Sequence, residues 1–157
     1  MKCAIEMNQV VEQVQAIQLA QKLAEERRIK RAIAMAQENS VAFCETVIAK
    51  KLEQAAKAGE RSCDVILGLH CWSNDPYRGM NLYGPIERDG DVYADGTPSM
   101  RVKDEALSVE TIISYLRKHC YEVDVAEDTL PFKTYGSGWQ NGVLMRISIP
   151  KNTPCMG

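Results

Sequence analysis

Two His-Cys dipeptides are the features of this sequence that most resemble a chemical site. They are His70-Cys71 and His119-Cys120. A structural zinc ion takes about four ligands, usually including a close-spaced pair such as Cys-x-x-Cys. Adjacent residues in a strand point to opposite faces, so the four side chains could converge only from loops at one edge of a sheet. We therefore expect the histidines and cysteines of both dipeptides to be hydrogen-bonded or half-buried at the ends of helices or strands. We predict no metal and no cofactor.

A cysteine nucleophile is a second possibility, in which His119 would activate Cys71. Such a thiol becomes reactive only when its surroundings lower its pKa, and no flanking sequence marks that environment. A serine triad, a phosphate-binding loop and a carboxylate pair are also missing from the sequence. The sequence therefore favours a protein without catalytic residues.

Residues 89–96 resemble a calcium-binding loop, because Asp91, Asp95 and Gly96 fit positions one, five and six. Position three is Tyr93 and position twelve is Val102, so the bidentate glutamate of such loops is missing. Tight turns on Asp-Gly explain the segment better, and we predict a hairpin over residues 86–93.

The six cysteines, at positions 3, 44, 63, 71, 120 and 155, are widely spaced along the chain. The sequence shows no secretory context, so all six thiols are predicted to be reduced. Cys44 and Cys63 fall on apolar faces and are interpreted as small core residues.

Two aromatic segments, residues 72–85 and 135–139, are predicted to be irregular. Aromatic and arginine side chains in long loops often anchor an interface, although they could equally cover the edge of a sheet. A small-ligand site between the two segments is the alternative. The predicted partner-binding residues are Trp72, Tyr77, Arg78, Tyr83, Tyr135 and Trp139.

These segments must be positioned by the long stretch 8–58, which contains neither glycine nor proline and stops at Gly59. It is rich in helix-forming residues, and glycine is the usual residue just past a helix end. Such a helix is longer than a domain of this size, so we expect a bend near residues 25–31 or 39–40, or a projecting first half. A two-helix hairpin is the less favoured alternative, because turn residues are lacking.

This helix carries two apolar faces. One apolar stripe is expected to face the core (Val41, Cys44, Ile48, Leu52 and Ala55). An earlier seam is expected to pack against a partner helix (Met7, Val10, Val14 and Ile17).

The rest of the chain alternates shorter elements. Strands are predicted at residues 63–69, 121–125 and 143–149, and a helix capped by Ser108 is predicted through about His119. The fold class is α+β: a long N-terminal helix, then a small two-layer domain with a three-stranded, largely antiparallel sheet and a second helix. The predicted organisation is a helical arm over 1–40, usable for oligomerisation, an α+β domain over 41–150 and a loose tail over 151–157.

Charge and hydropathy bear on the partners and the location of the protein. Residues 1–58 carry a net charge of +2 and residues 59–157 a net charge of −4, so nucleic-acid binding is not expected. The basic cluster 27–31 is interpreted as a solvated helix face. No apolar run of 18 residues and no signal-peptide pattern occur, so we predict no membrane association and a cytoplasmic location.

The run 52–62, the segment 115–123 and the strand ending at Ile149 together resemble small proteins of bacterial phages and prophages. Those proteins pair a helix ending in Ala-x-Gly with a later Leu-x-x-x-Gly-Tyr-x-Val turn, and Cys120 stands here in place of that glycine. The resemblance covers roughly residues 48–149. It implies a phage or mobile-element origin and, in the host cytoplasm, a protein partner.

The first functional hypothesis is therefore a non-catalytic protein-binding module, plausibly an inhibitor of a host defence factor in the manner of anti-CRISPR proteins. The alternative is a small enzyme or a ligand-binding protein with its site between residues 72–85 and 135–139. The N-terminal seam adds a homodimer to the expected assemblies.

Overall fold

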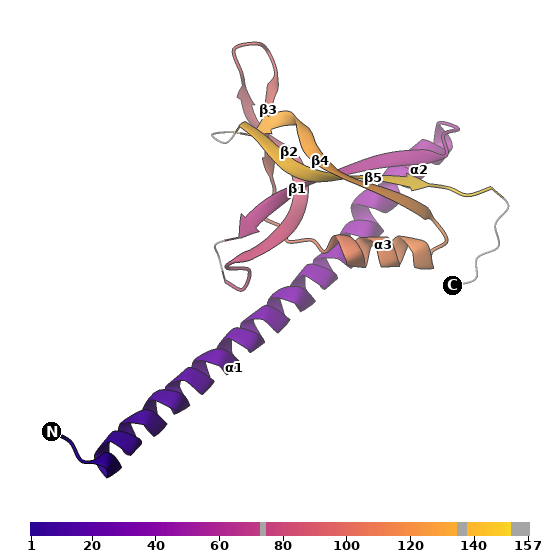
Figure 1. Ribbon diagram of the computed structural model, residues 1–157. Coiled ribbons are helices and arrows are strands. Elements are labelled where there is room, and N and C mark those ends of the chain that lie inside the picture. Colours follow the sequence, from indigo (N-terminus) through magenta and orange to yellow (C-terminus); the bar gives the residue numbers. More distant parts are fainter. Residues whose placement is uncertain (73–74, 135–137, 152–157) are drawn as a thin grey trace.

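The computed structural model describes residues 1–72, 75–134 and 138–151; the side chains of residues 70–72, 81, 127–134 and 138–141 lie outside the described part. One long helix leads into a barrel that a short helix covers (Figure 1). The elements are α1 (Ala4–Phe43), the π-helical turn η1 (Cys44–Ile48), α2 (Ala49–Lys57), β1 (Ser62–Trp72), β2 (Met80–Val92), β3 (Pro98–Val102), α3 (Val109–Lys118), β4 (Glu122–Thr134) and β5 (Gly138–Ser148).

The predicted long helix is confirmed, and it runs without a break through residues 25–40 (Figure 1). α1 is therefore about 60 Å long, and its first half projects away from the barrel. The helix ends as predicted at Gly59, whose φ of 76° places it in the left-handed region. The Glu60 amide donates to the Ala55 carbonyl at 2.9 Å, which closes the helix end in a Schellman motif.

The interruption in this helix falls at η1, beyond both places where a bend was expected. At 3.6 residues per turn, the buried face marked by Ala36, Ser40 and Phe43 would continue through Val47. The π-helical turn adds one residue to the turn, so Ile48 is fully buried and Val47 stays 41% exposed. This shift brings Leu52 and Ala55 into the core, as the sequence predicts.

The sheet has five strands and closes into a barrel in the order β1-β2-β3-β4-β5, so the prediction of three strands is wrong. β1 pairs antiparallel with both β2 and β5, and β4 pairs antiparallel with β5. β3 and β4 meet in parallel at Met100 and Thr134, which closes the barrel. The two extra strands are β2 and β3, and β4 and β5 are longer than the strands predicted at 121–125 and 143–149.

The predicted Asp-Gly hairpin is also displaced. Asp89 and Gly90 lie inside β2, where the pairing with β3 shifts register between Arg88 and Val92. Gly90 has a φ of 95°, which is typical of a bulge rather than a regular strand residue. The chain reverses later, where the Tyr93 amide donates to the Thr97 carbonyl at 2.9 Å.

The core lies between the helices and one side of the barrel. The strand faces predicted from alternation are confirmed at Val65 and Leu67 in β1 and at Val143, Met145 and Ile147 in β5, all buried. They pack against apolar side chains from the end of α1, from η1 and α2, and from α3: Phe43, Cys44, Ile48, Leu52, Ile112 and Leu116.

Asn39 and Ser40 fix the long helix to the segment before α3. The Asn39 side-chain amide donates to the Ala106 carbonyl at 3.1 Å. The fully buried Ser40 hydroxyl accepts from the Ser108 amide at 2.7 Å and lies 2.6 Å from the Ala36 carbonyl. Ser108 in turn caps α3 as predicted, because its hydroxyl accepts from the Thr111 amide at 3.3 Å.

Candidate functional site

One predicted partner-binding residue of the first aromatic segment, Tyr77, faces the long helix. Tyr77 is half-buried and packs with Leu82 against Ala36 and Ala106. Its burial raises the pKa of the phenol, although a hydrogen bond to Asn39 acts in the opposite direction. This side chain therefore helps to dock the β1–β2 turn onto α1, which leaves little of the ring for a partner.

The guanidinium group of Arg28 also holds the β1–β2 turn. Arg28 donates to the carbonyl oxygens of Pro76 and Arg78 at 2.9 and 2.6 Å. Its remaining contact is with Glu25, and this hydrogen bond lowers the pKa of the Glu25 carboxyl. Arg78 is itself exposed, so of the predicted residues in this turn it is the one presented to solvent.

The other predicted residues divide into two groups. Tyr83 is half-buried against the main core, and its carbonyl accepts from the Leu107 amide at 2.8 Å. Tyr135 lies outside the described residues, and the side chains of Trp72 and Trp139 lie outside the described part as well. The structure therefore does not bring the two aromatic segments together into a described binding surface.

Neither His-Cys dipeptide forms a described metal site. His119 is exposed and stacks on Tyr115 with ring centroids 4.3 Å apart. Within the described part of the chain, no three histidine, cysteine or acidic side chains gather closely enough to hold a metal ion. The side chains of His70 and Cys71 are outside that part.

One predicted thiol is not free. Cys120 is disulfide-bonded, whereas Cys3, Cys44 and Cys63 are free, so the prediction of six reduced thiols is wrong at Cys120. Spacing along the chain could not reveal this bond, because two cysteines far apart in sequence can be neighbours in the fold. Cys120 also has a φ of 69°, in the left-handed region that favours glycine.

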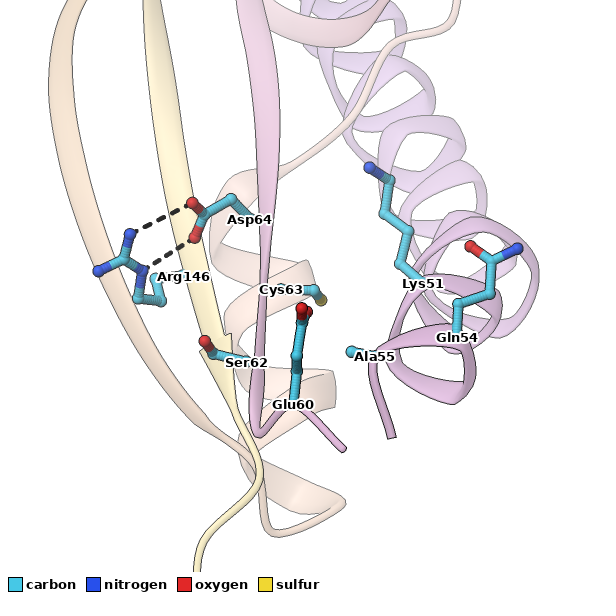
Figure 2. Close-up of a pocket in the computed structure, with 8 residues that line it drawn as sticks. All are labelled: Lys51, Gln54, Ala55, Glu60, Ser62, Cys63, Asp64 and Arg146. Atoms are coloured by element: carbon cyan, nitrogen blue, oxygen red, sulfur yellow. Dashed lines mark hydrogen bonds and ion pairs between the residues drawn. The ribbon is translucent and has the colours of Figure 1, made fainter. Parts of the chain in front are cut away.

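An open groove between α2 and β1 is a candidate small-ligand site (Figure 2). Its volume is about 510 Å³, and it is lined by Lys51, Gln54, Ala55, Glu60, Ser62, Cys63, Asp64 and Arg146. Sequence analysis names Ala55 and Cys63 only as core residues and predicts none of the eight as a site residue. Alternation along β1 sends Cys63 towards α2 and Asp64 to the outer face (Figure 2).

Two of the charged groups that line this groove, Asp64 and Arg146, are paired with each other. Arg146 donates to both Asp64 oxygens, at 2.9 and 3.3 Å. This contact lowers the pKa of the Asp64 carboxyl, so the group is a carboxylate held by a guanidinium rather than a proton donor. Burial raises the pKa of the Cys63 thiol, which keeps it protonated and weakly nucleophilic. Cys63 is therefore not an activated nucleophile, and Asp64 is not a general acid.

The projecting half of α1 carries many exposed apolar side chains. We call residues 4–27 the arm; every side chain in it is exposed, and contact with the barrel begins at Arg28 (Figure 1). The predicted seam lies along it, with Val14 46% and Ile17 58% exposed. Further exposed apolar side chains of the arm are Ile5, Val11, Leu19 and Leu23.

Comparison of the chain with models of protein families, with curated proteins and with solved structures finds no match. Among the described helices, none combines the length and the apolar character that crossing a bilayer requires. Function must therefore be inferred from the arm, the barrel and the groove themselves.

Proposed function

We propose that this protein is a non-catalytic protein-binding module that holds its partner through the apolar seam of the arm. The seam consists of Met7, Val10, Val14 and Ile17, which follow one another at spacings of three and four residues on one helix face. The single observation that carries the proposal is that this face is uncovered along the whole arm.

Energetics support this reading. A large aliphatic side chain gains roughly 1.5–3 kcal/mol when it moves from water into an apolar contact. Single apolar residues scattered over a protein surface are normal, whereas a contiguous apolar patch usually marks an interaction site. The four side chains of the seam form such a patch. A helix face that is apolar at spacings of three and four fits a partner helix or a groove that accepts one.

The described chemistry supports binding rather than catalysis. In the groove, the thiol is protonated and the carboxylate is paired with Arg146. The groove is also open to solvent, whereas small-molecule sites usually enclose most of their ligand. A small ligand in the groove is therefore the less supported function.

The resemblance to phage proteins suggests a class of target for the barrel. In this part of the proposal the protein inhibits a host defence factor by binding it, in the manner of anti-CRISPR proteins, and Arg78 with the neighbouring aromatic segments contacts that factor. The exposed position of Arg78 is the described feature that supports this target surface. Affinity capture on the wild type and on Arg78→Ala would test it, because the target should be lost only from the variant.

Site-specific photocross-linking tests the arm directly. A benzophenone amino acid placed at Val14 should form an adduct with a protein, either in purified samples or in cells. The same group at Glu12, on the face of the helix opposite the seam, is the matched control and should give little adduct. Equal labelling at both positions, or none at Val14, would refute the arm as a binding surface.

A further inference from the structure

We infer that the occupant of the arm's seam is a second copy of this chain, running antiparallel. The inference rests on the proposed function of the arm and adds the identity and direction of the partner. Three features carry it: the side of the helix on which the barrel sits, the symmetry of the apolar pattern, and the lack of facing like charges beside the seam.

The barrel lies on the same side of α1 as the seam. Val14 and Ala32 are eighteen residues apart, which is about five full turns of an α-helix, so they point in the same direction. Ala32 is 0% exposed, and Ala36, one turn further, is covered by Tyr77, Leu82 and Ala106. From Arg28 onwards, the barrel therefore fills the space beside the helix into which the seam faces.

This geometry excludes a parallel pair. In a parallel coiled coil each residue faces its own equivalent, so a helix packed on Val14 would continue past Ala32 and run into the barrel. An antiparallel helix meets no such obstacle, because it leaves the seam in the direction away from the barrel. The two barrels then lie at opposite ends of the paired arms.

The apolar pattern of the arm is symmetric about Glu12, which is what a two-fold antiparallel pair requires. Met7 and Ile17 are equally distant from Glu12, and so are Val10 and Val14. In this register Met7 packs against Ile17 of the second copy, and Val10 packs against Val14 of the second copy. The symmetry extends to Ala4 with Ala20 and Ile5 with Leu19.

The charges of the arm are compatible with this register. Beside the seam, Gln13 meets its own equivalent, and Glu6 lies opposite Ala20 of the second copy, so no like charges face each other. At the ends, the first turn of α1, residues 4–7, lies opposite residues 17–20 of the second copy, which carry no charge.

Cysteine cross-linking tests both the partner and its direction. Among the free cysteines that the structure describes, Cys3 is the exposed one, so Cys3→Ser removes it, and one further cysteine is then placed at Gln13 or at Ile17. The antiparallel register predicts efficient disulfide-linked dimers for Gln13→Cys and few for Ile17→Cys alone. A mixture of Met7→Cys and Ile17→Cys chains should cross-link to each other.

The outcomes separate this inference from the proposed function. Efficient cross-linking of Ile17→Cys to itself would show a parallel pair and overturn the inference. A chain that stays monomeric at all concentrations would also overturn it. In that case an adduct to another protein from photocross-linking at Val14 would leave the proposed function standing, whereas absence of any adduct would remove both.

Discussion

At the scale of single residues, Ser40 is the polar group whose removal should cost most. Its buried hydroxyl is the acceptor for the Ser108 amide at 2.7 Å. Ser40→Ala would leave that amide unsatisfied, which costs about 1–3 kcal/mol. Chemical denaturation should show this loss, whereas Ser114→Ala, on the exposed side of α3, should change stability by less than about 0.5 kcal/mol. Equal effects of the two substitutions would contradict the role assigned to Ser40.

Cys44 should make stability fall at alkaline pH. Burial raises the pKa of its thiol to about 11. Between the ordinary thiol pKa and this value, the unfolded chain loses the proton while the folded chain keeps it, so stability falls as pH rises from about 9 to 11. The expected loss is on the order of 2 kcal/mol. Cys44→Ala should flatten this dependence; an unchanged slope would show that the buried thiol is not its source.

At the scale of elements, the long helix and the strands with regular alternation could be predicted, and the bulged strands could not. Val65 and Leu67 mark β1 because they alternate on one side of that strand and are both buried. β2 contains the bulge at Gly90, which breaks the alternation on which the prediction depends. The sequence did not predict the π-helical turn at residues 44–48 either. The spacing of Cys44, Ile48 and Leu52 nevertheless predicted correctly that these three side chains are buried.

Glycines at the crossing of β1 and β2 permit the close approach of β3. A Cβ on Gly84 would meet the Lys103 carbonyl oxygen at 2.6 Å, and one on Gly68 would meet a Val102 methyl at 2.3 Å. Overpacking of this kind typically costs about 1–3 kcal/mol. Thermal unfolding should show that Gly84→Ala and Gly68→Ala both destabilise. Val102→Ala should rescue Gly68→Ala but not Gly84→Ala, because a backbone carbonyl cannot be trimmed; rescue of both would contradict the described packing.

The candidate sites were predictable to different degrees. The seam of the arm follows from spacing alone, because four apolar residues on one helix face are visible in sequence. The groove between α2 and β1 unites residues from three distant segments, so only the fold reveals it. Tyr77 shows the limit of composition: an aromatic residue in a glycine-rich and proline-rich segment suggested an interface, yet it packs onto α1.

At the scale of the whole molecule, the protein is a barrel carried at one end of a long, apolar-sided helix. The barrel and its covering helices contain the core, whereas the arm contributes no buried side chain. Loss of the arm's contacts should therefore change assembly while leaving the barrel folded. The pairing of arms can therefore be tested by measuring assembly, without unfolding the protein.

The most direct measurement is the molar mass in solution of the wild type and of the triple variant Val10→Ser, Val14→Ser and Ile17→Ser. Light scattering should give twice the chain mass of 17.6 kDa for the wild type and the single chain mass for the variant. The melting of the barrel should be nearly the same in both. A wild type that is monomeric over a wide concentration range, or a variant that remains dimeric, would contradict the pairing of arms.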